Sequence, residues 1–177
     1  TERKTKVMAT IITARIVAAD IMAMKKNLVI ILCSILLASC QREVVYTQFV
    51  ELPLQGWDSK KTITFTPTIT DTLTDYQLQL TLRHNDQYPY QNMWMFIGIK
   101  HDSTFILTDT IECYLANERG EWLGGGISQY ELPMIYENNY RFERSGIYHI
   151  TIEQGMRNEQ LVGITSIGVK IISNEQK

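Results

Sequence analysis

Alternation of apolar and polar residues constrains this chain more than any other feature of its sequence. Between residues 76 and 83, Tyr76, Leu78, Leu80 and Leu82 occupy one phase and polar side chains occupy the other. Successive side chains of a strand point to opposite faces, so the pattern predicts a β-strand with one buried face. Similar alternation occurs in residues 62–66, 110–115, 148–153 and 165–171.

Turn-forming residues separate these runs, among them Asn85-Asp86, Gly124-Gly125-Gly126 and Asn138-Asn139. Residues 93–99 are apolar in both phases, as in a central strand. No apolar stripe of helical period extends beyond two turns after residue 40. We therefore predict one all-β domain of about eight or nine strands, folded as a jelly-roll-like β-sandwich. A barrel is the alternative that the pattern leaves open.

A bacterial lipoprotein signal precedes this domain. Positive charge at Met24-Lys25-Lys26 is followed by a mostly apolar run, residues 27–37, which is shorter than the roughly 20 residues that span a bilayer. The tetrapeptide Leu37-Ala38-Ser39-Cys40 ends the signal. It predicts a diacylglyceryl group on the Cys40 thiol and an acyl chain on its new amino group. We expect no other cofactor.

The signal predicts four segments. Residues 1–23 precede a complete signal and are interpreted as an over-extended N-terminus, and residues 24–39 are the cleaved signal peptide. Residues 40–46 are a lipidated tether, or the start of an edge strand, and residues 47–177 form the β-sandwich domain. Of the three cysteines, only Cys113 would remain free after cleavage and lipidation, so no disulfide within the chain is expected.

Charge excludes one class of partner. Residues 1–39 hold six of the 17 basic and two of the 19 acidic side chains, so the mature part keeps 11 basic and 17 acidic residues, a net charge of −6. Because binding to nucleic acid relies on a basic surface, we predict no nucleic-acid partner.

The sequence offers candidates for a binding surface but none for catalysis. Tyr, Trp and Arg are enriched at binding hot spots, and several occur with amide side chains near predicted loops. The candidates are Arg83, Asn85, Tyr88, Tyr90, Asn92, Trp122, Gln154 and Arg157. Structural roles in loop packing are the alternative for most of them, and Trp94 is interpreted as a core residue.

Enzyme and metal motifs are missing from the sequence. Gly124-Gly125-Gly126 lacks the lysine of a phosphate-binding loop, and no Gly-x-Ser-x-Gly elbow occurs. His84, His101 and His149 do not have the spacing of metal ligands. We therefore predict no enzyme, no catalytic residue and no metal site, although two carboxylates could still meet in space.

Two segments, residues 82–97 and 146–169, together with residues 121–126 and the lipoprotein signal, resemble the gliding-motility lipoprotein GldH family of Bacteroidota. The Tyr-Pro-Tyr-x-Asn pattern at Tyr88 and the Glu-Gln-x-Met-Arg pattern at Glu153 carry most of the resemblance, which covers Cys40 to Ile172. It implies a small cell-envelope lipoprotein associated with surface motility and the linked protein secretion. Only the acylated cysteine, matched by Cys40, carries over as a functional residue.

The combined prediction is a non-catalytic outer-membrane lipoprotein that acts as an accessory or interaction subunit of an envelope assembly. Its partners would be the membrane, through the lipid, and envelope proteins of a motility or secretion assembly. The alternative is a carbohydrate-binding β-sandwich lipoprotein. Gln41 follows the lipidated cysteine, and no acidic run comes after it. We therefore expect the periplasmic face of the outer membrane.

Overall fold

The computed structural model describes residues 42–102 and 104–175. The predicted over-extension, signal peptide and lipidated Cys40 lie outside these residues. Within them, no helix is long and apolar enough to cross a membrane. The described elements are all strands: β1 Val44–Glu51, β2 Trp57–Asp58, β3 Ile63–Phe65, β4 Thr68–Ile69, β5 Tyr76–Asn85, β6 Asn92–His101, β7 Thr104–Tyr114, β8 Gln129–Tyr140, β9 Gly146–Gln154, β10 Gln160–Leu161 and β11 Ile164–Ser173.

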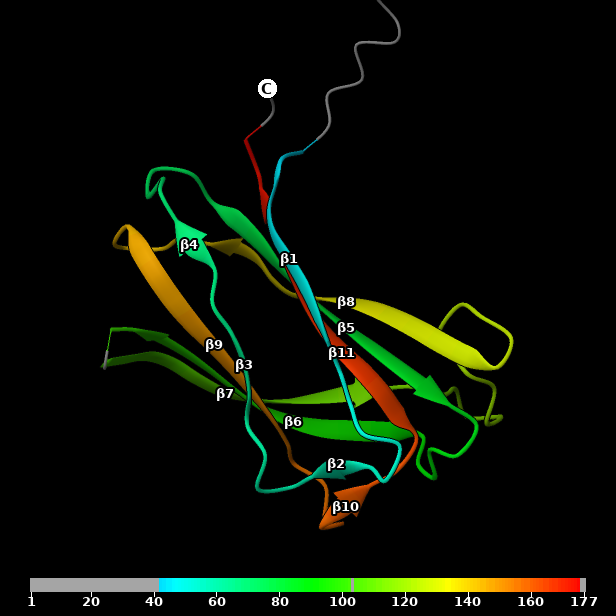
Figure 1. Cartoon of the computed structure of the whole chain (residues 1–177). Helices are drawn as coiled ribbons and strands as arrows, with labels where there is room; N and C mark the ends of the chain where they lie inside the picture. Colours follow the sequence, from blue (N-terminus) through cyan, green and yellow to red (C-terminus); the bar gives the residue numbers. More distant parts are fainter. Residues whose placement is uncertain (1–41, 103, 176–177) are drawn as a thin grey trace, which may run out of the picture. The chain divides into compact units, whose positions relative to one another are not determined.

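The long strands form two antiparallel sheets (Figure 1). The first, here called the β1 sheet, has the order β1-β11-β5-β8. The second, the β6 sheet, has the order β3-β9-β6-β7, with β4 also paired to β9. A short separate pair joins β10 to β2.

The connections between the sheets define the topology. The first and last strands, β1 and β11, are neighbours in the β1 sheet, while β3 and β9 are neighbours in the β6 sheet. From β4 to β6 and again from β7 to β9, the main chain passes from one of these sheets to the other at each connection, as in a jelly roll, and after β10 it returns to the β1 sheet as β11. The prediction of an all-β sandwich is confirmed.

The alternation in the sequence explains the core. On β5, Leu78, Leu80 and Leu82 are buried, and they join side chains of both sheets in one apolar cluster. Burial of each such side chain contributes about 1.5–3 kcal/mol. From the β6 sheet, Met95 and Ile152 meet this cluster and are fully buried.

The prediction that Trp94 belongs to the core is wrong. On β6, Met93, Met95 and Ile97 take the inward phase, so Trp94 and Phe96 point to the outer face. The side chain of Trp94 is 39% exposed. Trp57 is the tryptophan that is fully buried, and its Nε1 donates a hydrogen bond to the carbonyl of Lys61 at 3.0 Å.

Candidate functional site

The outer face of the β6 sheet carries several exposed aromatic side chains. Trp94 and Phe96 project from β6, and Phe105 projects from β7, with exposed fractions of 39%, 47% and 53%. Thr151 and Glu153 of β9 lie opposite Gly98 and Phe96 in the ladder and share their face. We call these five residues, with Gly98 between them, the aromatic face.

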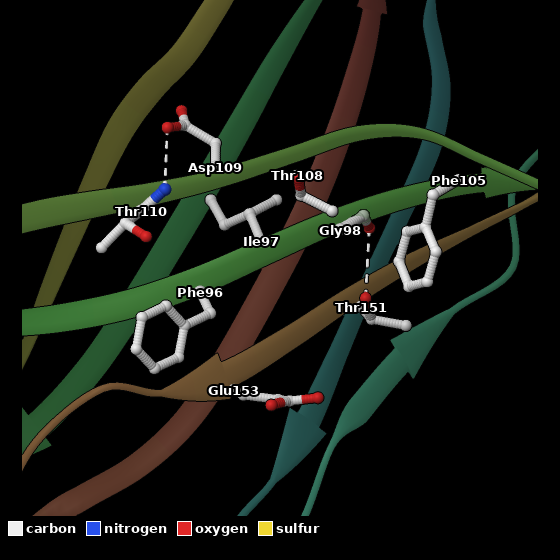
Figure 2. A pocket seen from close by; sticks show the side chains of 9 residues that line it. All are labelled: Phe96, Ile97, Gly98, Phe105, Thr108, Asp109, Thr110, Thr151 and Glu153. Carbon is white, nitrogen blue, oxygen red and sulfur yellow. Dashed lines mark hydrogen bonds between the residues drawn. The ribbon is translucent and has the colours of Figure 1, made fainter.

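A hollow of about 480 Å³ lies in this face. Figure 2 shows Phe96 and Phe105 on either side of it, with Gly98 and Thr151 between them and Glu153 at its margin. The hydroxyl of Thr151 donates a hydrogen bond to the Gly98 carbonyl at 3.3 Å. The floor of the hollow is therefore polar, and aromatic rings form the two sides of the hollow.

Glycine at position 98 keeps the hollow open. A Cβ atom here would lie 2.6 Å from Oγ1 of Thr151 and 3.0 Å from the ring of Phe105. Any larger residue would displace these side chains from the floor. The sequence thus places the smallest residue where the side chains of Thr151 and Phe105 approach the main chain.

Glu153 and Lys100 place one negative and one positive charge at the aromatic face. Glu153 accepts a hydrogen bond from the hydroxyl of Thr62 at 2.7 Å. The Lys100 ammonium lies 3.8 Å from the ring centre of Phe105, a cation–π contact. Such a surface can contact apolar or ring-shaped groups while offering hydroxyl and carboxylate oxygens as hydrogen-bond partners.

A second, smaller hollow brings together three of the predicted binding residues. Tyr90, Asn92 and Arg157 line this space of about 260 Å³, together with Trp94 and Met156. Trp94 also belongs to the aromatic face, so the two hollows are neighbours on β6. Arg157 is exposed and has no ion-pair partner among the described residues.

Hydrogen bonds fix the walls of the smaller hollow. The Tyr90 hydroxyl donates to Oδ1 of Asn158 at 2.7 Å, and the Asn92 amide donates to Glu112 at 2.5 Å. The first bond joins the segment before β6 to the loop after β9, and the second joins β6 to β7. The hollow is therefore shaped by tertiary contacts.

Two other predicted binding residues, Tyr88 and Gln154, stabilise the segments around the smaller hollow. Both are buried, and the Tyr88 hydroxyl donates to the Asn92 carbonyl at 2.7 Å. Nε2 of Gln154 donates a hydrogen bond to the main-chain carbonyl of Asn158 at 2.7 Å. Its Oε1 accepts a hydrogen bond from the main-chain N–H of Met156 at 2.9 Å. Their side chains hold loops and contribute little exposed surface.

The other predicted residues lie elsewhere. Asn85 caps a turn by accepting a hydrogen bond from the Gln87 amide at 3.0 Å. Arg83 projects from the outer face of the β1 sheet, where its Nε is 2.8 Å from Glu131. Trp122 lies 4.5 Å from the ring of buried His84, and its Nε1 donates to Asp86 at 3.1 Å.

The remaining described cysteine, Cys113, is a buried thiol. Burial raises the pKa of the Cys113 thiol to about 12, so the thiol stays protonated at neutral pH. In the described parts of the chain, no group of three or more His, Cys, Asp or Glu side chains is placed to hold a metal ion.

His84 predicts a dependence of stability on pH. Its ring is fully buried among Tyr88, Trp122 and Tyr130, and neither ring nitrogen has a hydrogen-bond partner in the described residues. Burial lowers the pKa of His84 below its ordinary value of 6.5, and the Asn85 backbone and the Asp86 carboxylate oppose this only in part.

Below pH 6.5 the unfolded chain therefore binds a proton at His84 that the folded chain excludes. We expect the free energy of unfolding to fall as pH decreases from 6.5 toward the lowered pKa, by at most about 1.4 kcal/mol per pH unit from this group. Urea denaturation of the wild type and of His84→Leu at pH 7 and pH 5 measures the effect. An equal loss of stability in both proteins would contradict it.

Together, fold and site define a class of protein: a jelly-roll β-sandwich that presents an aromatic surface on one sheet. Residues 44–171 match the family model described as GldH lipoprotein. The chain therefore belongs to the GldH lipoprotein family, as the resemblance in its sequence predicted. This is a family of lipoproteins and not a family of enzymes.

Two curated relatives extend this match. The gliding motility lipoprotein GldH of Flavobacterium johnsoniae is 30% identical over 164 residues, covering 88% of this chain and 99% of the relative. The homologue from Christiangramia forsetii is 30% identical over 145 residues, covering 77% of this chain and 88% of the relative. A solved CBM4 structure is similar at 10% identity and a TM-score of 0.35, covering 77% of this chain and 81% of its own. That likeness is too distant to carry an argument about function.

Proposed function

We propose that this protein is a non-catalytic lipoprotein that binds envelope proteins through its aromatic face, as an accessory subunit of an assembly linked to gliding motility and protein secretion. The observation that carries the proposal is the exposure of Trp94, Phe96 and Phe105 on one sheet of a GldH-family domain. Large apolar side chains that gather on a surface are typical of protein contacts.

Crosslinking in living cells tests this proposal. A photo-reactive phenylalanine analogue at position 96 should capture envelope proteins, which can be identified after purification of the tagged, lipidated chain. Ile135, on the outer face of the β1 sheet, is the matched control because it is 57% exposed, against 47% for Phe96. Capture at position 135 alone, or at neither position, would contradict the proposal.

The double substitution Trp94→Ala with Phe96→Ala should separate binding from folding. We expect partner capture to fall at least about tenfold, because loss of two hot-spot side chains costs more than about 1.4 kcal/mol of binding. The free energy of unfolding should change by only about 1 kcal/mol, since both side chains are partly solvated. Pull-down and urea denaturation measure the two effects, and Ile135→Ala should alter neither.

Carbohydrate binding is the second candidate function. It is favoured by one observation: Phe96 and Phe105 flank a hollow that also offers the Thr151 hydroxyl and the Glu153 carboxylate. Sugars present apolar ring faces and hydroxyl groups, which such a site can contact. Adding soluble envelope polysaccharide should then change the fluorescence of Trp94, next to the hollow, and Trp94→Phe should lose that response. No change at saturating polysaccharide would exclude this candidate.

We place the lipidated chain on the periplasmic face of the outer membrane. The sequence after Cys40 supports this, because Gln41-Arg42-Glu43 contains no acidic run. Protease added to intact cells should leave the protein uncut, while the same protease should digest it after lysis. Digestion without lysis would place the protein on the cell surface instead.

A further inference from the structure

The chain leaves little distance between the proposed lipid and the first strand. β1 begins at Val44, four residues after Cys40. Each residue adds at most about 3.6 Å, so a lipid on Cys40 would hold the start of β1 within about 14 Å of that residue. This step rests on the proposed lipid anchor. The end of the domain where β1 begins must then lie next to the membrane.

Hydrogen bonds show which segments share that end. The amide of Ser173 donates to the Glu43 carbonyl at 2.8 Å, and the amide of Asn174 donates to the Asp75 carbonyl at 2.9 Å. The loop between β4 and β5, residues 70–75, therefore lies at the same end of the domain as the start of β1, as Figure 1 also shows.

Leu73 is the most exposed large apolar residue of this loop, at 86%. Asp71 holds the loop in shape: its carboxylate accepts hydrogen bonds from the Leu73 amide at 2.8 Å and from the Thr74 hydroxyl at 2.5 Å. Its carbonyl accepts a third from the Tyr76 hydroxyl at 2.8 Å. The loop thus presents an exposed apolar side chain on a backbone that hydrogen bonds hold in place.

The structure assigns this loop to the lipid surface: we propose that Leu73 inserts into the interface of the membrane that the Cys40 lipid anchors. The lipid supplies the anchor, and Leu73 sets the orientation of the domain on the membrane. The occupant is a bilayer because the short link to Cys40 brings this end, and not the opposite end, against it.

Charge does not drive this contact. Near the start of β1, Arg141 is already paired with Asp75 at 2.7 Å, and Asp71 is acidic as well. An acidic end gains nothing from anionic headgroups, so the contact should depend on apolar burial. We therefore expect Leu73 to contact vesicles of phosphatidylcholine, which has no net charge. The contact should persist at about 1 M salt as well as at about 0.1 M salt.

Depth-dependent fluorescence quenching tests the proposal. The lipidated full chain carrying Leu73→Cys, labelled with the fluorophore NBD, is reconstituted in phosphatidylcholine vesicles that contain a doxyl-lipid quencher. Leu54→Cys is the matched control, because Leu54 is 87% exposed and follows the far end of β1. Cleavage of the signal removes Cys33, a lipid blocks the Cys40 thiol and Cys113 is buried, so the introduced cysteine is the one that reacts.

We expect quenching at position 73 to be several-fold stronger than at position 54. Equal quenching at both positions, or none at either, would overturn the proposal. Mass spectrometry of the same sample reports the lipid on Cys40, so failure of the anchor is distinguished from failure of the Leu73 contact.

A second reporter separates the role of Leu73 from proximity alone. NBD on Thr70→Cys, an exposed position in the same loop, should be quenched in the presence of Leu73 and several-fold less after Leu73→Ser. Unchanged quenching in the Leu73→Ser background would show that the tether alone sets the orientation, and would also overturn the proposal.

Discussion

Gly163→Ala should lower the free energy of unfolding by about 3 kcal/mol or more. Gly163 has a φ of +87°, a conformation that side chains rarely adopt. A Cβ atom would also lie 2.2 Å from the Tyr88 amide nitrogen and 2.5 Å from the Tyr88 Cα. Backbone atoms cannot rotate away as a side chain can, so the loop before β6 would have to move. Urea denaturation measures the change.

Gly125→Ala is the matched control for this prediction. A Cβ atom at Gly125 would meet no atom within 4 Å, so we expect a change within about 0.5 kcal/mol. A similar effect of the two substitutions would contradict the assignment of strain to Gly163. Hydrogen exchange adds a second readout: the Asn85 amide, which donates to the Gly163 carbonyl at 2.9 Å, should lose protection in Gly163→Ala.

The fold could be predicted where one phase of a strand is apolar and the other polar. On β5, the alternation of Leu78, Leu80 and Leu82 with polar residues assigned the buried face correctly. On β6 both phases are apolar, so the sequence contains no signal for which phase is inward. Trp94 and Phe96 were therefore missed as surface residues, and only the pairing with β7 and β9 places them outside.

The candidate site could be predicted only in part, because it depends on contacts between distant segments. Tyr90 and Asn158 are 68 positions apart and meet through a hydrogen bond that no local pattern indicates. Arg83 lies on the other sheet because β5 belongs to the β1 sheet, where its register with β8 places it opposite Glu131. The exposed aromatic residues Phe96 and Phe105 carry one signal that could have found them: they occur on either side of Gly98, and Phe105 lies in a strand that contains three threonines.

Cys40→Ala should move the protein from the membrane fraction to the soluble fraction. The substitution removes the thiol that a diacylglyceryl group modifies, while Ala38-Ser39 followed by the new alanine forms the A-x-A site at which an ordinary secretory signal is cleaved, so the apolar run is still removed. Each buried CH₂ contributes about 0.8 kcal/mol, and two or three acyl chains together hold a protein stably on a membrane. Without them the folded domain keeps only weak contacts, such as that proposed for Leu73, while the net charge of −6 in residues 40–177 opposes binding to anionic lipid.

The other two cysteines provide the controls for this prediction. Cys33→Ala lies within the predicted signal and should leave anchoring unchanged, since alanine keeps that run apolar. Cys113→Ala alters a buried thiol in β7, so it should affect stability while the chain stays with the membrane. Fractionation before and after a carbonate wash, with mass spectrometry of the lipid, compares all three variants. Retention of Cys40→Ala on washed membranes would show that another part of the chain anchors it, which would remove the physical basis for placing the β1 end of the domain at the bilayer.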